Sequence, residues 1–315
     1  MFKIPILILT YNRPDHLIRL IIRINKIKPS KIYISCDGPK NNLDLININR
    51  IHNVVNLINK NSKVFKNFYK ENKGIKLAPQ SGISWFFRKE KMGIILEDDC
   101  LPNKFFFKYA ETLLVKYKNN KKIYAISGYN PLEKTKFGDG FYFLSNYFLC
   151  WGWATWRRAW KNSYKTISDQ ESQNIFSIIK KIFFNDIELR YWKKTIKFLI
   201  ACKIKTWDIF FLVSIWKKNA YCLLPNVNMI QNIGFDSSAT TSPWLNYKVA
   251  KVFNYKKNIN SPNFLEINKV NEDLIFNSMF LPKNFLYPWR LLYIIKSIIF
   301  SPKFFFYKIR KKFSK

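Results

Sequence analysis

Histidine and cysteine, the usual ligands of structural zinc, are scarce in this sequence. The histidines are His16 and His52, and no two cysteines form a CxxC pair, so the spacing of a His/Cys zinc site is missing. An odd number of scattered cysteines instead indicates reduced, buried thiols in a cytosolic protein. The five cysteines are Cys36, Cys100, Cys150, Cys202 and Cys222.

Several longer signatures are also missing. No uncharged apolar run approaches the length that spans a bilayer, and the N-terminus opens on a strand-like run rather than a signal peptide. There is no zinc-finger spacing and no basic helix followed by heptads, so we expect no nucleic acid partner. Neither a GxGxxG nor a P-loop follows the first apolar run, which argues against dinucleotide-binding enzymes and ATPases.

Acidic residues are few: 20 Asp and Glu stand against 54 Lys and Arg, giving a net charge of +34. Such a charge favours anionic partners. Lys, Ile, Asn and Phe are used heavily throughout, however, so charge alone identifies no particular partner. The 315 residues are 48% hydrophobic, enough for one large α/β domain or two smaller ones.

Against this basic background, three acids stand together at Glu97–Asp99. They follow the apolar run Ile94–Leu96, which predicts a short buried strand, and they precede Pro102, which cannot continue a sheet. Ligands bind at the carboxyl ends of parallel strands, and adjacent carboxylates there suit Mg²⁺ or Mn²⁺ holding a diphosphate. The alternatives are a solvated acidic turn, or an N-cap for a helix that begins near Asn103.

The first third of the chain alternates strands with helices, which predicts a mostly parallel sheet flanked by helices. The helix before the fourth strand is expected to begin near Pro79 and to run through Phe87. Arg13, Asp37 and Glu97–Asp99 each follow a predicted strand, so one sheet edge would gather a cation, a carboxylate and a metal site. The predicted strands are Ile4–Thr10, Ile32–Cys36, Val64–Tyr69 and Gly93–Leu96.

Tryptophans cluster between Trp151 and Trp160. If 154–160 is helical, Trp153, Trp156 and Trp160 share one face, which indicates either core packing or an aromatic wall for a sugar ring. Further along the chain, one basic helix is predicted over Ile175–Lys203.

Asp208 opens an apolar helix that is predicted over Ile209–Trp216. The residue is either a helix cap or first-turn acid, or a general base beside Trp207. The polar stretch Asn226–Thr241, which follows a strand ending at Pro225, has the length of a lid loop.

The last segment has a different composition. No acidic residue follows Asp273, and Phe285–Lys315 mixes large apolar side chains with Lys and Arg. This pattern predicts a basic, amphipathic, helical tail that lies on an anionic membrane surface, although a helix packed on the body of the protein remains the alternative. We therefore divide the chain into a main α/β domain, 1–260, and a membrane-interface tail, 261–315.

Six short motifs, listed below in chain order, together resemble those of the GT-A glycosyltransferases, whose fold is Rossmann-like. The similarity is narrower to the bacterial hemolytic-protein-like glycosyltransferases and more distant to Golgi N-acetylglucosaminyltransferase I. It extends from about Ile4 to Thr241 and does not include the basic tail. The motifs are Thr10-Tyr11-Asn12-Arg13-Pro14, Cys36-Asp37-Gly38-Pro39, Glu97-Asp98-Asp99, Trp151-Gly152-Trp153, Trp207-Asp208 and Asn232-Ile233-Gly234.

The resemblance implies an inverting transferase that takes a sugar from a nucleotide-sugar, usually a UDP-sugar, at a Mn²⁺ or Mg²⁺ site. By matching position, Arg13 and Asp37 would hold the nucleotide base. Glu97 and Asp98 would contact the ribose and the donor sugar. The acceptor would be a glycan or a lipid-linked sugar of surface polysaccharide or lipooligosaccharide synthesis. The enzyme would then be cytoplasmic and peripheral on the inner face of the membrane.

The resemblance also assigns the remaining roles. Asp99 would ligate the metal, and Asp208 would be the catalytic base. Thr240 and Thr241 fall where relatives close a segment over the donor, although the His of that segment is missing here. Trp153 and Trp207 are candidates for the wall of a sugar or acceptor site.

Two rival functions remain open. A sugar nucleotidyltransferase shares this sheet architecture, but it usually needs a Gly-rich basic loop after its first strand, and Tyr11–Pro14 does not resemble one. The second rival is a non-catalytic protein that binds membranes or polyanions through its charge. Stabilisation by UDP together with Mn²⁺ would separate the enzyme from this binding protein.

Overall fold

A computed structural model describes residues 1–161, 163, 169–183, 185–201, 206–235, 250–253 and 258–280. The chain divides into two compact units, Met1–Glu272 and Asp273–Lys315. Thr240, Thr241 and the predicted tail Phe285–Lys315 lie outside the described residues, and the predicted functional boundary after residue 260 stays a prediction. None of the helices in the described part is both long and apolar enough to cross a membrane.

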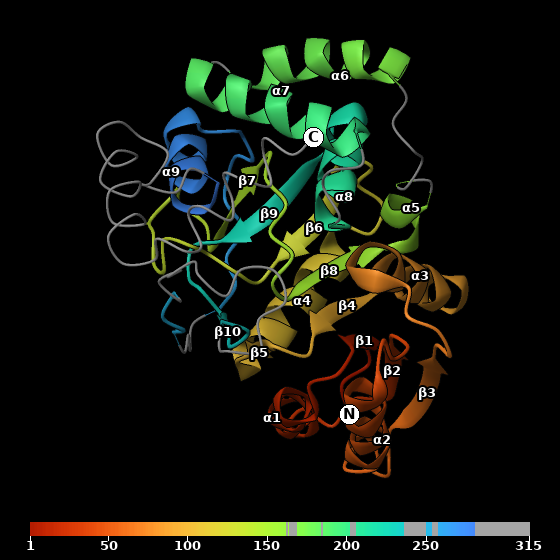
Figure 1. Ribbon diagram of the computed structural model, residues 1–315. Helices are drawn as coiled ribbons and strands as arrows, with labels where there is room; N and C mark the ends of the chain where they lie inside the picture. The colour runs from red at the N-terminus through yellow and green to blue at the C-terminus, as the bar shows by residue number, and fades with distance from the viewer. Residues whose placement is uncertain are drawn as a thin grey trace, which may run out of the picture. The chain divides into compact units, whose positions relative to one another are not determined.

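The core of the first unit is a mixed sheet of eight strands in the order β3-β2-β1-β4-β8-β6-β9-β7 (Figure 1). All of these strands run in one direction except β8 and β7, which confirms the predicted mostly parallel α/β fold. The strands are β1 (Ile6–Thr10), β2 (Lys31–Cys36), β3 (Lys63–Phe68), β4 (Met92–Glu97), β6 (Ile123–Ser127), β7 (Tyr142–Ser145), β8 (Trp153–Trp156) and β9 (Tyr221–Pro225).

The order of the first four strands positions the site. Strands β1 and β4 are neighbours, while the chain between them runs outward through β2 and β3, so the strand order reverses between β1 and β4. A Rossmann-like sheet binds its ligands at this switch point, beyond the carboxyl ends of the strands. Both strands are almost fully buried, which agrees with their uninterrupted apolar sequence.

Helices pack on both faces of the sheet. Strand β8 directs Trp153 toward one face, where it meets Trp160 and Phe211, and Trp156 toward the other, where its indole N–H donates to Leu114. The helices of the first unit are α1 (Pro14–Asn25), α2 (Asn42–Val55), α3 (Gly74–Lys89), α4 (Lys104–Lys116), α5 (Arg157–Trp160), α6 (Asp169–Ile182), α7 (Asp186–Ile200) and α8 (Asp208–Lys217). Helix α9 (Lys269–Met279) begins in the first unit and ends in the second.

Helix α3 begins five residues before the predicted start, at Gly74, and Pro79 lies inside it. The N–H groups of Lys73 and Gly74 both donate to the carboxylate of Asp37, which fixes the early start. Proline has no N–H to bond Ile75 in the preceding turn. Ile75 and Pro79 both line the cavity described below, so the interrupted turn faces open space.

Two further predictions of helices are wrong. The stretch predicted as one helix, Ile175–Lys203, contains the end of α6 and then α7, because Asn185 caps a new helix by accepting from the N–H of Ile187. Trp153 and Trp156 are not on a helix either. They lie on β8, which pairs antiparallel with β4 and β6, and only Trp160 belongs to the short helix α5.

The predicted lid loop, Asn226–Thr241, is buried over its first part. It forms β10 (Ile230–Asn232), which pairs antiparallel with β5 (Cys100–Pro102) in a small second sheet. Before β10, a side chain takes the place of regular backbone hydrogen bonds between strands. The side-chain amide of Asn228, which is fully buried, donates to the carbonyl oxygens of Ile230 and Ala250. The prediction that Pro102 cannot continue a sheet is wrong, because Pro102 is the last residue of β5 and lies opposite Ile230. The proline is tolerated there because a two-stranded sheet leaves one edge of each strand unpaired.

Candidate functional site

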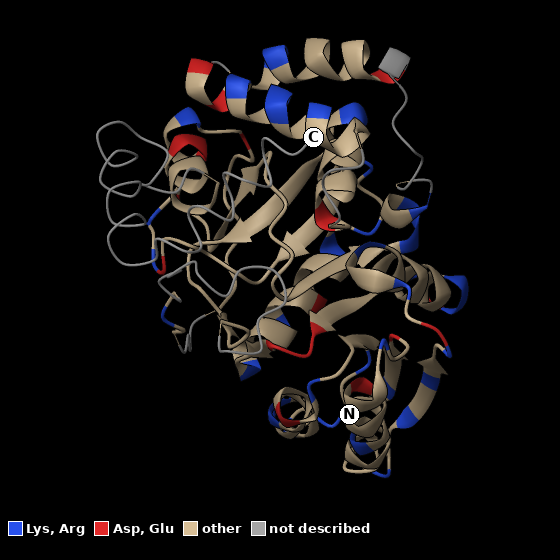
Figure 2. Cartoon of the chain, in the orientation of Figure 1, with Lys and Arg blue, Asp and Glu red and all other residues tan. Residues whose placement is uncertain are grey.

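A cavity of about 410 Å³ lies at the switch point of the sheet. Its walls come from the connection after β1, the end of β4, the beginning of α3 and the beginning of α8. Figure 2 shows acidic residues at the end of β4 and at the start of α8, in a chain whose charged residues are mostly Lys and Arg. The predicted site residues that line the cavity are Arg13, Asp37, Glu97, Asp98, Asp99, Trp207 and Asp208.

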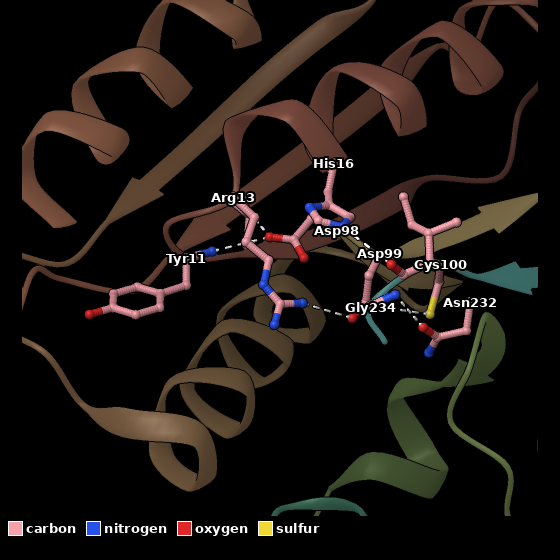
Figure 3. Close-up of polar contacts among 10 residues, drawn as sticks. Tyr11, Arg13, His16, Asp98, Asp99, Cys100, Asn232 and Gly234 are labelled. Carbon is pink, nitrogen blue, oxygen red and sulfur yellow. Dashed lines mark hydrogen bonds and ion pairs between the residues drawn. The ribbon is translucent and has the colours of Figure 1, made fainter. Parts of the chain in front are cut away.

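Glu97 is the last residue of β4, and the two acids that follow it, Asp98 and Asp99, have different partners. Asp98 turns toward β1, where it accepts from the Thr10 hydroxyl at 2.7 Å and from the Tyr11 N–H at 3.4 Å. Asp99 forms an ion pair with Arg13, whose Nη1 lies 3.2 Å from Oδ2 (Figure 3). The structure therefore places the guanidinium of Arg13 beside the predicted metal ligand, and its predicted contact with a nucleotide base stays a prediction.

Burial and mutual repulsion disfavour the charged forms of these carboxyls. Burial, followed by repulsion from three neighbouring carboxylates, raises the pKa of Glu97 to about 8. Burial and then the charge of Asp99 raise the pKa of Asp98 to about 6. Burial also raises the pKa of Asp99, although the nearby Arg13 opposes this. Additional positive charge in the cavity would therefore be bound favourably.

The carboxylates fit a divalent cation that the substrate helps to hold. No group of three or more His, Cys, Asp or Glu side chains among the described residues has the arrangement of a metal site built from protein ligands alone. Mg²⁺ commonly needs only one or two carboxylates, with phosphate oxygens and waters as its other ligands. Asp99 lines the cavity beside a cation, Arg13, that can also bind phosphate, so the oxygen donors present suit such a site.

Asp208 is the first residue of α8 and lies across the cavity from the β4 acids. Burial raises its pKa, while hydrogen bonds from the Thr206 hydroxyl and from the N–H groups of Asp208 and Ile209 lower it. Its Oδ2 lies 4.0 Å from the Cys150 thiol, a weak donor. Asp208 is thus a first-turn acid that faces the same space as Asp99 and Glu97.

Asp37 has a structural use that the sequence did not reveal. The carboxylate is 7% exposed and accepts four hydrogen bonds, three from backbone N–H groups and one from the Asn72 amide. These bonds fasten the start of α3 to the end of β2. The predicted contact of Asp37 with the nucleotide base is not tested by them.

The two candidate tryptophans differ in exposure. Trp207 lines the cavity, although it is only 4% exposed. Trp153 is 1% exposed and stacks on Trp207 with ring centroids 5.7 Å apart. For Trp153 the structure shows core packing, the alternative that the sequence left open.

Sequence reasoning missed two residues that support the site. Asp44 on α2 accepts from the Tyr11 hydroxyl at 2.6 Å and from the Asn12 amide at 2.7 Å, and so holds the connection after β1. His16 on α1 lies with Nε2 3.3 Å from the Ile233 carbonyl oxygen. No local signal marks either residue, because both act across long sequence separations.

Comparisons with known proteins identify no family. No family model matches the sequence, and no curated protein matches it. Three of the solved structures that resemble the chain have TM-scores below 0.5, and these weak likenesses carry no information on its substrate.

The first is HddC from Yersinia pseudotuberculosis, at 12% identity over 50% of this chain and 79% of that chain, with a TM-score of 0.33. The second is 4-diphosphocytidyl-2C-methyl-D-erythritolsynthase from Anaerococcus prevotii, at 10% identity over 60% and 83%, with a TM-score of 0.31. The third is UDP-glucose pyrophosphorylase complexed with UDP-glucose, at 11% identity over 73% and 93%, with a TM-score of 0.37.

Proposed function

We propose that this chain is an inverting GT-A glycosyltransferase that moves a sugar from a nucleotide-sugar, a UDP-sugar in the first instance, to a glycan or lipid-linked acceptor. The observation that carries the proposal is a single cavity at the switch point of the sheet. It gathers a cation, Arg13, a strand-end carboxylate cluster around Asp99, and a separate buried carboxylate, Asp208. The six motifs that resemble GT-A enzymes include all of these residues.

Each residue has a stated part in this reaction. Asp208 accepts the proton of the acceptor hydroxyl, while that oxygen bonds the anomeric carbon and the bond from this carbon to the diphosphate breaks. Burial raises the pKa of Asp208, which brings a carboxylate closer to the range that suits a general base near neutral pH. Arg13 contacts the nucleotide base, as the resemblance implies, and its guanidinium beside Asp99 also holds phosphate oxygens by charge-assisted hydrogen bonds.

Asp99 would hold Mn²⁺ or Mg²⁺, which when bound would neutralise charge on the leaving diphosphate. The Asp99→Asn variant should keep its fold and lose the Mn²⁺-dependent part of the stabilisation that UDP gives. The test compares melting temperatures with UDP alone, Mn²⁺ alone and both together, in wild type and variant. Equal stabilisation of both proteins by UDP with Mn²⁺ would remove Asp99 from the site.

The connection after β1 disfavours the nucleotidyltransferase alternative. The side chains of Tyr11 and Asn12 are both fastened to Asp44, so this short segment is not an open, Gly-rich loop that could wrap a triphosphate. Incubation with UTP and a sugar 1-phosphate, followed by assay for pyrophosphate, tests this alternative directly. Release of pyrophosphate without sugar transfer from any nucleotide-sugar would favour the nucleotidyltransferase.

A further inference from the structure

The segment Asn232–Phe235, which begins at the last residue of β10, lies directly against Asp99 (Figure 3). The Ile233 N–H donates to the carbonyl oxygen of Asp99 at 2.9 Å, which extends the β5–β10 pairing in which Asn232 is opposite Cys100. A segment more than a hundred residues later in the chain is therefore hydrogen-bonded to the backbone of Asp99, the predicted metal ligand.

Gly234 has no room for a side chain. A Cβ atom at this position would overlap Oδ2 of Asp99 and would lie 2.9 Å from its Cγ. Gly234 does not have a positive φ, so only its close approach to Asp99 opposes a larger residue, which would force the Asp99 side chain to move. The backbone of Gly234 thus forms a wall that limits the rotamers of the Asp99 carboxylate.

Three contacts hold the Asn232–Phe235 segment in this place. The Gly234 N–H donates to Oδ1 of Asn232 at 2.8 Å, and His16 Nε2 lies 3.3 Å from the Ile233 carbonyl oxygen. The Phe235 and Trp151 rings pack in a T-shaped arrangement, with ring centroids 5.5 Å apart. The segment is therefore fixed by α1 and by the Trp151–Trp153 motif as well as by β5.

Strand β10 itself is seated by two glycines. A Cβ on Gly152 would overlap the side chain of Ile230. A Cβ on Gly128 would overlap the ring of Phe106 and would lie 2.9 Å from Cγ1 of Ile230. Gly152 also has a φ of +64°, a conformation that favours glycine. The packing of Ile230 therefore determines where Asn232–Phe235 meets Asp99.

We propose that Asn232–Phe235 is a positioning element that orients the Asp99 carboxylate for a divalent cation. Gly234 sets the rotamer, and His16 holds the segment through Ile233. This inference rests on the proposed function, because it assumes that Asp99 binds Mn²⁺ or Mg²⁺. Groups that orient a ligand without touching the metal typically change metal affinity by about 10- to 100-fold when they are replaced.

The test titrates Mn²⁺ into the full-length protein at a fixed UDP concentration and measures free Mn²⁺ by electron paramagnetic resonance. Gly234→Ala should weaken Mn²⁺ binding by about 10- to 100-fold. Gly138→Ala is the matched control: this exposed glycine has a φ of +68° with open space around it, so alanine adds backbone strain without touching the site. Its Mn²⁺ affinity should equal that of wild type.

A second pair of variants decides the question if Gly234→Ala does not fold. His16→Leu cannot donate to the Ile233 carbonyl and should weaken Mn²⁺ binding, whereas the side-chain amide of His16→Gln can donate and should restore much of it. Binding of UDP without Mn²⁺ and the melting temperature of the ligand-free protein should be the same in both His16 variants. A role confined to folding would change these two measurements instead.

Two outcomes separate the inference from the function on which it rests. If wild type binds Mn²⁺ with UDP and both Gly234→Ala and His16→Leu bind it equally well, the positioning role is overturned and the proposed function stands. If wild type binds no Mn²⁺ in the presence of UDP, the proposed function is overturned, and the inference with it.

Discussion

The four hydrogen bonds of Asp37 lead to an unusual expectation for a conservative substitution, Asp37→Asn. One carboxylate oxygen accepts from the N–H groups of Gly38 and Lys73, and the other accepts from the Gly74 N–H and the Asn72 amide. An asparagine keeps one oxygen and presents an NH₂ group to two donors. The variant therefore loses two of four charge-assisted bonds and leaves their donors facing a donor.

Each hydrogen bond to a charged group contributes about 1.5–3 kcal/mol, so Asp37→Asn should lower the free energy of unfolding by about 3 kcal/mol or more. For a domain of this size the melting temperature should fall by roughly 6 °C or more. Urea denaturation without nucleotide measures the effect. The control is Asp15→Asn, because Asp15 is 73% exposed and its ion pair with Arg50 should contribute little.

A different result would refute this reasoning. If Asp37→Asn unfolds at the same urea concentration as wild type but no longer binds UDP, the carboxylate serves the ligand and not the start of α3. If the variant is destabilised and the folded fraction still binds UDP, Asp37 is a structural anchor. In that case the contact with the base that the GT-A resemblance implies is absent.

Three further predictions concern the acids and the tail. Asp208→Asn should keep donor binding and melting temperature but lose transfer activity by roughly 100-fold or more, measured by release of UDP. Without Mn²⁺, wild type should lose stability as pH rises from about 5 to 9, because folded Glu97, with its pKa raised to about 8, holds a proton that the unfolded chain releases. Urea midpoints across this range should be flatter for Glu97→Gln. The full-length protein should sediment with anionic liposomes, and salt should weaken this binding. A chain ending at Pro282 should lose most of this sedimentation but keep UDP–Mn²⁺ binding. Equal sedimentation of both proteins would exclude the tail as the anchor.

The sequence predicted the part of the fold that is coded locally. Strands β1, β2 and β4 are apolar runs closed by turn residues, and Arg13, Asp37 and Glu97–Asp99 lie at their ends because the chain must leave the sheet there. Parallel pairing of β1 with β4 then brings Arg13 and Asp99 together without any further information. This is why most of the candidate site could be assembled from short motifs.

The missed elements have their determinants elsewhere in the chain. Strand β8 is four residues long and pairs with β4, which lies about sixty residues earlier, so its Trp-rich sequence could equally be read as a helix. Asp44 and His16 look like ordinary helix residues, and the bond from His16 spans 217 positions. The periodicity of apolar residues along a helix cannot predict such long-range contacts.

For the Asn232–Phe235 segment, the sequence identifies the motif, but only the tertiary structure explains its glycine. Its motif, Asn232-Ile233-Gly234, was recognisable by resemblance, but nothing in its composition said what the glycine was for. The structure supplies the reason, since Gly234 leaves the volume that the Asp99 side chain occupies. A glycine required by a neighbour's side chain, and not by its own φ, is invisible to turn rules and follows only from the packing of β10 on β5. The same packing makes the orientation of Asp99 depend on residues more than a hundred positions away.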